Sequence, residues 1–157
     1  MPNRILAIDP GTRCGWARLD GAQVESGVWD FSGPQSWGAK WSDFHARLMG
    51  KTTALQAQTI VCEDQTRIRG RYALLCWGWQ VMVMALAAQQ HMELLVVNPA
   101  TLKKWATGSG KASKDEMVRA TNAQMAILQP YTGRRRAIWD DNEADALLLL
   151  AWAREQG

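Results

Sequence analysis

The chain has 157 residues, a length that suits one domain with its own hydrophobic core and no disulfide staples. With 47% apolar and 21% charged residues the composition is globular, which excludes a disordered chain, and a net charge of +3 permits a nucleic-acid partner without requiring one. No apolar run is long enough to span a membrane and the first residues do not resemble a signal peptide, so we expect a cytoplasmic protein whose three cysteines (Cys14, Cys62 and Cys76) are reduced.

The first half of the chain predicts three strands, a helix and a fourth strand. Strands are expected at Arg4 to Ile8, Cys14 to Leu19 and Gln23 to Phe31. Turn sequences end the first and the second of them. Their close spacing predicts an antiparallel meander. A helix is expected from about Gly38 to Gln56, where apolar residues recur near helical spacing, and a β-branched strand at Thr59 to Cys62.

Helices and strands alternate in the second half. From about Gly70 to Gln90 we expect a long helix that is apolar nearly all round. Such a helix is buried on more than one side, either by a second subunit or inside the chain between the sheet and the last helix. Met92 to Val97 is expected to be a strand and Ala100 to Trp105 a short helix. A capping-box pattern opens a helix from about Ser113 to Met125, and the last helix runs from about Asp141 to Arg154.

This order of elements predicts an α/β fold in a single domain, residues 1–157. Because strands alternate with helices after the meander, we expect a mixed five-stranded sheet in which three antiparallel strands are followed by two parallel ones. The helices are expected to cover both faces of that sheet.

Four carboxylates stand where they could meet. Asp9 and Glu63 each sit at the C-terminal end of an apolar strand, and if those strands are parallel neighbours both side chains emerge at one edge of the sheet. Asp141 and Asp145 are four residues apart on the last helix and share a face. Carboxylates that converge take up protons unless a cation compensates their charge, and oxygen ligands suit Mg²⁺ or Mn²⁺. Two such ions could clamp the attacking and leaving oxygens of a phosphodiester displacement.

Each acid also has an ordinary explanation. Asp9 could start a turn, Glu63 could be a surface charge at a strand end, and Asp141 could be an N-cap. Asp145 is harder to explain in this way, because a carboxylate on the inward side of an apolar helix needs a partner. The combination is more specific than any one member.

Basic residues gather in three clusters, each beside a candidate site segment. The clusters are Arg67, Arg69 and Arg71; Lys103, Lys104, Lys111, Lys114 and Arg119; and Arg134, Arg135 and Arg136. The residues expected to contact DNA are Arg67, Arg69, Lys103, Lys104, Lys111 and Lys114. Trp105 could contact a base or sugar, but packing on a short amphipathic helix is the simpler interpretation.

Taken together, these segments resemble the RuvC-type Holliday-junction resolvases. The matching segments, in the family's order, are Ile8 to Thr12 with Gly15-Trp16-Ala17, Cys62 to Gln65, the basic run Pro99 to Met117, and the acidic stretch Asp141 to Leu147. The resemblance covers nearly the whole chain. The chain's compactness and terminal motif resemble those of phage or prophage members more than those of the bacterial housekeeping enzyme.

The resemblance implies a ribonuclease-H-like fold and a crossover junction endodeoxyribonuclease with two Mg²⁺ ions per active site, Mn²⁺ as a substitute and no small-molecule cofactor. It implies that Asp9, Glu63 and Asp145 are metal ligands, and that Lys103 and Lys114 contact phosphate near the scissile bond. It also implies a homodimer that binds four-way junctions and other branched DNA, in which each subunit cuts one of two opposing strands.

Two features depart from the family pattern. The fourth ligand usually lies three residues before the last acid, where this chain has Asn142; we favour Asp141 as the ligand, with the carbonyl oxygen of Asn142 as the alternative. The family's aromatic residue after the second acid is absent, because Thr66 and Ile68 occupy that stretch. Two other functions stay open: a related nuclease acting on flaps or RNA–DNA hybrids, and a non-catalytic junction-binding module.

Overall fold

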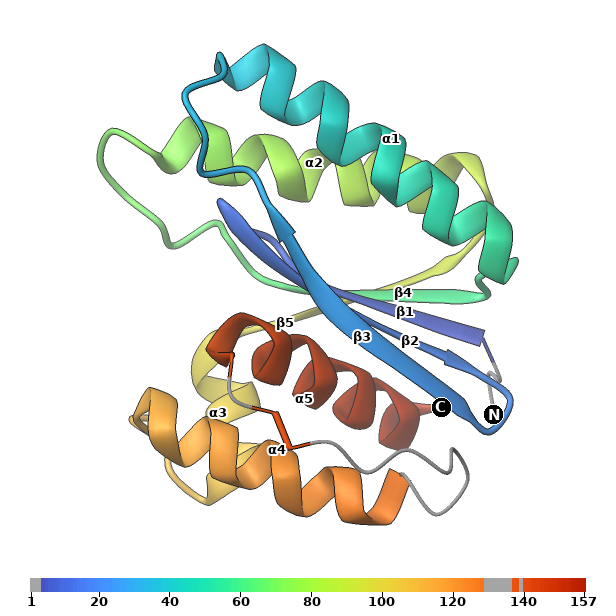
Figure 1. Ribbon diagram of the computed structural model, residues 1–157, viewed down its shortest axis with the longest axis vertical. Coiled ribbons are helices and arrows are strands. Elements are labelled where there is room, and N and C mark those ends of the chain that lie inside the picture. The colour runs from blue at the N-terminus through green and yellow to red at the C-terminus, as the bar shows by residue number, and fades with distance from the viewer. Residues whose placement is uncertain (1–3, 129–136, 139) are drawn as a thin grey trace.

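The sheet has five strands in the order β3-β2-β1-β4-β5 (Figure 1), in a computed structural model that describes residues 4–128, 137–138 and 140–157. The strands are β1 (Arg4–Asp9), β2 (Arg13–Asp20), β3 (Gln23–Asp30), β4 (Thr59–Glu63) and β5 (Glu93–Val97). β2 lies antiparallel to both β1 and β3, whereas β4 lies parallel to both β1 and β5. The predicted mixed sheet, three antiparallel strands followed by two parallel ones, is confirmed.

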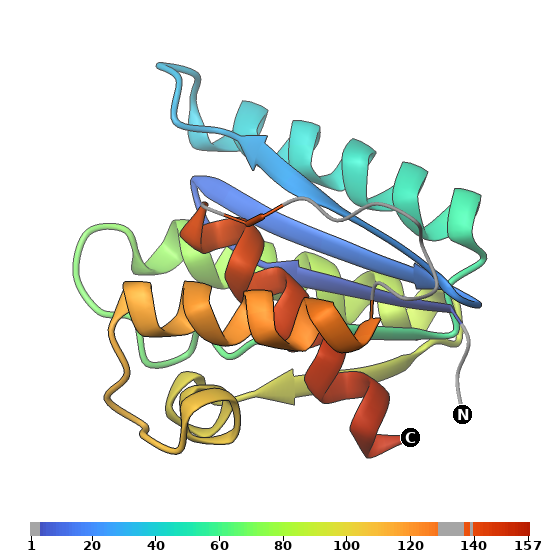
Figure 2. The same ribbon diagram turned by 60° about the horizontal axis from the view of Figure 1, so that its bottom comes forward.

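Helices cover both faces of the sheet, as the sequence predicts. One face carries α1 (Trp37–Leu55) and α2 (Ala73–Gln89), and the other carries α3 (Pro99–Thr107), α4 (Lys114–Leu128) and α5 (Asp141–Gln156) (Figure 1). Figure 2 shows α4 lying across α5, which itself packs on the sheet. In the described part of the chain, no helix is long and apolar enough to cross a membrane.

Strand β1 separates the two halves of the core, because its side chains alternate between the two faces of the sheet. Ile5 and Ala7 belong to the hydrophobic cluster that includes α5, whereas Leu6 and Ile8 belong to the cluster that includes α1 and α2. All four are fully buried. A strand enclosed on both sides has a continuous apolar sequence, which is why the sequence located β1.

Near the site, the two strand ends match the prediction and the start of α2 differs from it. Asp9 and Glu63 are the last residues of β1 and β4, as predicted. α2 begins at Ala73 instead of near Gly70. Gly70 has a left-handed backbone (φ 86°), which lies outside the right-handed helix and which glycine adopts without strain.

Caps define where α4 and α5 begin. The predicted capping box before α4 is present: the Ser113 N–H donates to Glu116 Oε2 (2.7 Å), and the Glu116 N–H donates to Ser113 Oγ (3.2 Å). Helix α5 is capped by Asp140, whose Oδ1 accepts hydrogen bonds from two N–H groups of the first turn. The interpretation of Asp141 as the N-cap is therefore wrong, and its carboxylate is left for other contacts.

Helix α2 is buried on one side only. Its buried side packs against the core, but four large apolar side chains on its other side are exposed. We call these residues, Leu74, Trp77, Val81 and Met84, the exposed α2 face. The interpretation that α2 lies wholly inside the chain is wrong, because α5, which would have supplied the second cover, packs on the opposite face of the sheet.

The start of α5 approaches β2 to backbone distance at Gly15. A Cβ atom built on Gly15 would lie 1.9 Å from the backbone oxygen of Asn142 and 2.5 Å from its carbonyl carbon. No side chain fits there, so glycine at this position permits the approach. The approach carries the first turn of α5, and with it Asp141, to the edge of the sheet.

We expect Gly15→Ala to destabilise the fold by about 3 kcal/mol or more, because the added methyl group meets backbone atoms that cannot rotate away. Gly50→Ala is the matched control: Gly50 lies inside α1 with nothing within 4 Å of an added Cβ. That change should stabilise the protein by about 0.5–1 kcal/mol through helix propensity. Urea unfolding measures both, and a Gly15→Ala variant as stable as wild type would contradict the close approach.

Candidate active site

Asp9 and Glu63 emerge side by side at one edge of the sheet. β1 and β4 are parallel and Ile8 is paired with Cys62, so the residues that follow this pair lie at the same level. Both acids end their strands at the carboxyl edge, where open α/β sheets place their sites. The condition set by the sequence, that the two strands be parallel neighbours, is met.

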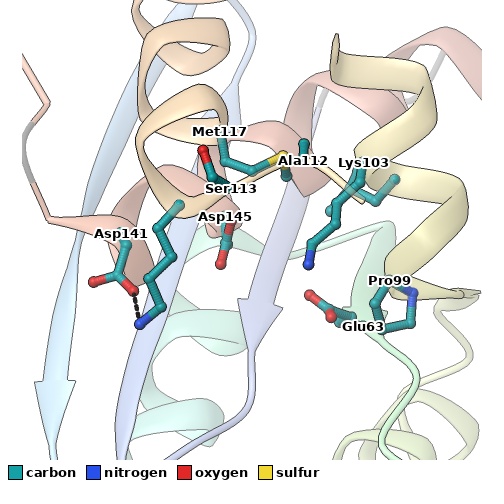
Figure 3. A pocket seen from close by; sticks show the side chains of 10 residues that line it. Glu63, Pro99, Lys103, Ala112, Ser113, Met117, Asp141 and Asp145 are labelled. Atoms are coloured by element: carbon teal, nitrogen blue, oxygen red, sulfur yellow. Dashed lines mark ion pairs between the residues drawn. The ribbon is translucent and has the colours of Figure 1, made fainter. Parts of the chain in front are cut away.

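Helix α5 brings two more carboxylates to this edge. Asp141 lies in its first turn and Asp145 one turn later, so the two share a face of the helix. Ala144 and Ala146, on either side of Asp145, are fully buried, and Asp145 itself is half-buried. Figure 3 shows Asp141, Asp145 and Glu63 around one pocket.

The pocket has a volume of about 320 Å³ and lies between three acids and two lysines (Figure 3). Its lining residues are Glu63, Pro99, Leu102, Lys103, Ala112, Ser113, Lys114, Met117, Asp141 and Asp145. Lys103 belongs to α3 and Lys114 is the first residue of α4. The Lys114 Nζ forms an ion pair with Asp141 Oδ2 at 2.7 Å. Asp9 is not a lining residue. It belongs to the site because it ends the strand next to that of Glu63 and because its carboxylate interacts electrostatically with the other three acids.

Burial and mutual repulsion raise the pKa values of three of the acids. Burial, and then repulsion by the other three acids, raises the pKa of Asp9 well above its usual value. Burial and repulsion by Asp145 raise the pKa of Glu63 to about 7. Burial and repulsion by Asp141 raise the pKa of Asp145 to about 6. The nearby Lys103 opposes the last two shifts without cancelling them. Burial and the neighbouring acids therefore disfavour full ionisation of these carboxylates, and the lysines do not restore their ordinary pKa values.

The donor set fits a hard divalent cation. All four acids offer carboxylate oxygens, which Mg²⁺ and Mn²⁺ prefer, and a cation would relieve the repulsion that raises the pKa values. Among residues 4–128, 137–138 and 140–157, no group of three or more His, Cys, Asp or Glu side chains has the geometry to hold a metal ion. Asp141 is instead paired with Lys114. Binding an ion therefore requires these side chains to rotate, and Asp141 to leave its lysine.

The residues that the sequence predicts as DNA contacts fall into two groups. Lys103 and Lys114 line the pocket. The other four predicted contacts are exposed and lie outside the pocket lining: Lys104 on α3, Lys111 before α4, and Arg67 and Arg69 on the loop between β4 and α2. The third basic cluster, residues 134–136, lies outside the described residues. Trp105 follows the packing interpretation: it is half-buried and its Nε1 donates to Glu155 Oε2 at 2.9 Å.

Sequence reasoning missed Arg13 and Asp140, which hold the start of α5 in place. Arg13 donates to Asp140 Oδ2 (3.0 Å) and to Asp30 Oδ2 (3.2 Å), so it ties the α5 cap to strands β2 and β3. One signal could have identified Asp140. It stands three residues before Glu143, which is the spacing of a capping box.

We expect the metal-free protein to lose stability as the pH rises from 5 to 7.5. Because Glu63 and Asp145 have pKa values of about 7 and about 6 when folded, against 4.5 and 3.8 as ordinary values, the folded state holds more protons than the unfolded state in this window. The free energy of unfolding should therefore fall with rising pH, and saturating Mg²⁺ should flatten the fall. Thermal unfolding measures both.

The matched variants for this test are Asp145→Asn and Asp20→Asn. Asp145→Asn removes one repelling carboxylate and should reduce the pH slope, whereas Asp20 is exposed at the end of β2, so Asp20→Asn should leave the slope unchanged. A metal-free wild type whose Tm is flat or rises between pH 5 and 7.5, with Asp145→Asn following the same course, would contradict the electrostatic account.

The fold matches solved structures of two Holliday-junction resolvases. A structure of RuvC from Thermus thermophilus has a TM-score of 0.73 at 21% identity, over 98% of this chain and 96% of that chain. T. thermophilus RuvC in complex with a Holliday junction substrate has a TM-score of 0.74 at 20% identity, with the same coverage. The yeast mitochondrial Holliday junction resolvase Ydc2 has a TM-score of 0.65 at 20% identity, over 99% of this chain and 80% of that chain. No protein-family model and no curated protein matches the chain. At this level of identity the likeness establishes the fold: the chain has the ribonuclease-H-like fold of RuvC.

Proposed function

We propose that this chain is a structure-selective, Mg²⁺-dependent endonuclease that resolves Holliday junctions and related branched DNA by paired nicks. The observation that carries the proposal is the meeting of carboxylates from β1, β4 and α5 at one edge of the sheet, beside two lysines. Acidic sites that hold two ions suit the hydrolysis of phosphodiester bonds. The likeness to resolvase structures, one of them solved with a Holliday junction, supports the substrate class.

The residues of the pocket divide the chemistry among them. Asp9, Glu63, Asp141 and Asp145 would hold two Mg²⁺ ions, which when bound supply a hydroxide nucleophile and stabilise the leaving oxygen. Lys103 and Lys114 would bind the phosphate oxygens, since their side chains line the same pocket. The buried apolar lining residues Leu102, Ala112 and Met117 would keep that wall of the pocket dry, which strengthens each charged contact.

Asp141 is better placed than Asn142 to be the fourth ligand. Its side chain lines the pocket, whereas Asn142 is not a lining residue and its backbone oxygen abuts Gly15. Because Asp140 caps α5, Asp141 is not committed to the helix N–H groups. A carboxylate is also a stronger ligand for a hard dication than an amide oxygen.

A homodimer is part of the proposal, and the exposed α2 face supports it. Helix α2 carries no charged residue over its whole length, so two copies could pack these faces together about a two-fold axis without burying charge. Contiguous exposed apolar side chains usually mark an interface. A two-fold dimer would present two sites to opposing strands of a two-fold-symmetric junction.

The proposed setting is the cytoplasm of a bacterial host, with the chain as a phage or prophage member of the group. This part of the proposal rests on the sequence, whose acidic motif at residues 141–147 resembles that of such members. A DNA substrate is consistent with it.

Cleavage of a labelled four-way junction should require Mg²⁺ or Mn²⁺ and stop when the metal is chelated. Asp9→Asn should abolish cutting while junction binding persists, because the change removes a metal ligand and leaves the exposed basic residues in place. Flap, duplex and RNA–DNA hybrid substrates are run in parallel. Preferential cutting of flaps or hybrids would show that the proposed substrate is wrong. Binding of the junction without cutting, whichever metal is added, would show that the chain is a junction-binding module and not a nuclease.

The fourth ligand is tested by Asp141→Asn against Asn142→Ala. Asp141→Asn should lower the cleavage rate at limiting Mg²⁺ by orders of magnitude and change the Tm little, since Asp140 still caps the helix. Asn142→Ala should cut nearly as well as wild type. The opposite pattern, with Asn142→Ala inactive and Asp141→Asn active, would assign the ligand to Asn142.

We expect the wild-type chain to sediment as a dimer at micromolar concentration and Val81→Glu to sediment as a monomer. Val81 is exposed in the single chain, so the change should alter the Tm of the monomer little while placing a charge in the proposed interface. Ala123→Glu, an exposed change on α4 on the opposite face of the sheet, is the matched control and should stay dimeric. A wild type that stays monomeric and still makes paired nicks would contradict the dimer.

A further inference from the structure

The chain that follows Glu63 is fastened to α2 through one residue, Gln65. Its backbone N–H donates to Gln80 Oε1 at 2.6 Å, and its backbone carbonyl accepts a hydrogen bond from Trp77 Nε1 at 2.9 Å. Gln65 is only 6% exposed and Gln80 only 7%. Both backbone groups of a residue two positions after the candidate ligand Glu63 are therefore held by side chains of α2, twelve and fifteen residues further along.

Asp64, the residue between Glu63 and Gln65, is held to the neighbouring strand by its backbone. The Asp64 N–H continues the sheet by donating to the Val97 carbonyl at 2.8 Å. The chain thus leaves β4 along the sheet and is then held by α2, so that the direction of the following loop depends on where α2 lies.

That loop, residues 64–72, carries the first basic cluster. Arg67, Arg69 and Arg71 are all exposed on it, and Figure 1 shows the loop extending beyond the sheet before α2 begins. The hydrogen bonds of its tip are local ones, such as the Thr66 N–H to Asp64 Oδ1 at 2.9 Å and Arg69 Nη1 to the Thr66 carbonyl at 2.5 Å. Local bonds give the tip a shape, but its position relative to the pocket comes from Gln65.

Trp77, unlike Gln80, is also exposed at the protein surface. Its indole N–H holds the loop, yet 41% of the residue is exposed, and it forms the exposed α2 face together with Leu74, Val81 and Met84. A second copy of the chain on that face would contact the same ring that fastens the loop. Ordering the ring there would reduce its freedom to leave the Gln65 carbonyl.

We propose that Trp77 and Gln80 are positioning residues that hold the basic loop beside the active site, and that Trp77 makes this hold depend on a second copy docked on the exposed α2 face. The inference rests on the proposed function for the role of the loop and for the dimer. Assembly and DNA contact would then be linked through one side chain, so that the loop is ordered in the dimer and looser in the monomer.

Limited trypsin digestion tests the hold without any activity, because the loop offers cleavage after Arg67, Arg69 and Arg71. In wild type, these bonds should be cut more slowly as protein concentration rises through the range in which sedimentation shows dimer. Trp77→Phe keeps an aromatic ring for the interface and loses only the indole N–H, so it should dimerise like wild type but be cut several-fold faster at every concentration. Gln80→Met, which removes the acceptor and keeps the side-chain length, should also be cut faster.

Trp41→Phe is the matched control, since Trp41 also donates its indole N–H to a backbone carbonyl of α2 (Leu75, 3.2 Å) but does not contact Gln65 in the described hydrogen bonds. It should be cut in the loop like wild type. Loop cleavage of dimeric Trp77→Phe at the wild-type rate would overturn the proposal, because simple shielding of the loop by the partner would then explain the protection. A wild type whose loop cleavage does not respond to concentration, or that never dimerises, would overturn it too.

Junction cleavage supplies the second readout. Trp77→Phe and Gln80→Met should raise the KM for a four-way junction several-fold with a smaller change in kcat, while Trp41→Phe should not, because a displaced loop weakens DNA contact without removing a metal ligand. Equal KM values for all four proteins would overturn the positioning role. If the wild type cuts no DNA, the proposed function fails by itself, and the trypsin result still decides whether α2 holds the loop.

Discussion

Helix α5 lies against β2 so closely that a methyl group at Gly15 would collide with the Asn142 backbone, and the candidate site depends on this approach. The approach brings Asp141 and Asp145 from the end of the chain to the edge where β1 and β4 deliver Asp9 and Glu63. Arg13 and the Asp140 cap hold it from the side. A shift of α5 away from β2 would separate the acids, so the close contact at Gly15, which is paired with Asp9 across the two strands, controls the electrostatics of the pocket.

Burying the acids and bringing them together costs the fold stability, which is why the pKa values of Asp9, Glu63 and Asp145 are raised. Lys103 and Lys114 offset part of it, and Lys114 does so by direct pairing with Asp141. The same two ammonium groups would suit a phosphate that enters the pocket. In the proposed function these groups would exchange partners: Lys114 pairs with a carboxylate in the absence of a cation, and both lysines would pair with phosphate once cations pair with the carboxylates.

The two sides of helix α2 make different contacts. Its buried side packs on the sheet opposite α5 and, through Gln80, holds the chain that leaves Glu63. Its other side presents an uncharged apolar face, to which Trp77 belongs. Because Trp77 also bonds to the Gln65 carbonyl, the loop that carries Arg67 and Arg69 is connected both to the candidate active site and to the proposed subunit contact.

Much of this protein follows from its sequence by itself. The apolar strand β1, the capping box of Ser113 and Glu116, the mixed sheet and the strand-end positions of Asp9 and Glu63 were all predictable. Each depends on residues close together in the chain or on the simple alternation of elements. The side of α2 that is exposed was not predictable, since a helix that is apolar all round has no periodicity to distinguish its faces. The contacts of Gly15 with Asn142 and of Gln65 with Trp77 and Gln80 were decided only by the tertiary structure. These contacts depend on the direction in which a backbone or side chain points once the helices have packed. No local pattern of residue types encodes that direction.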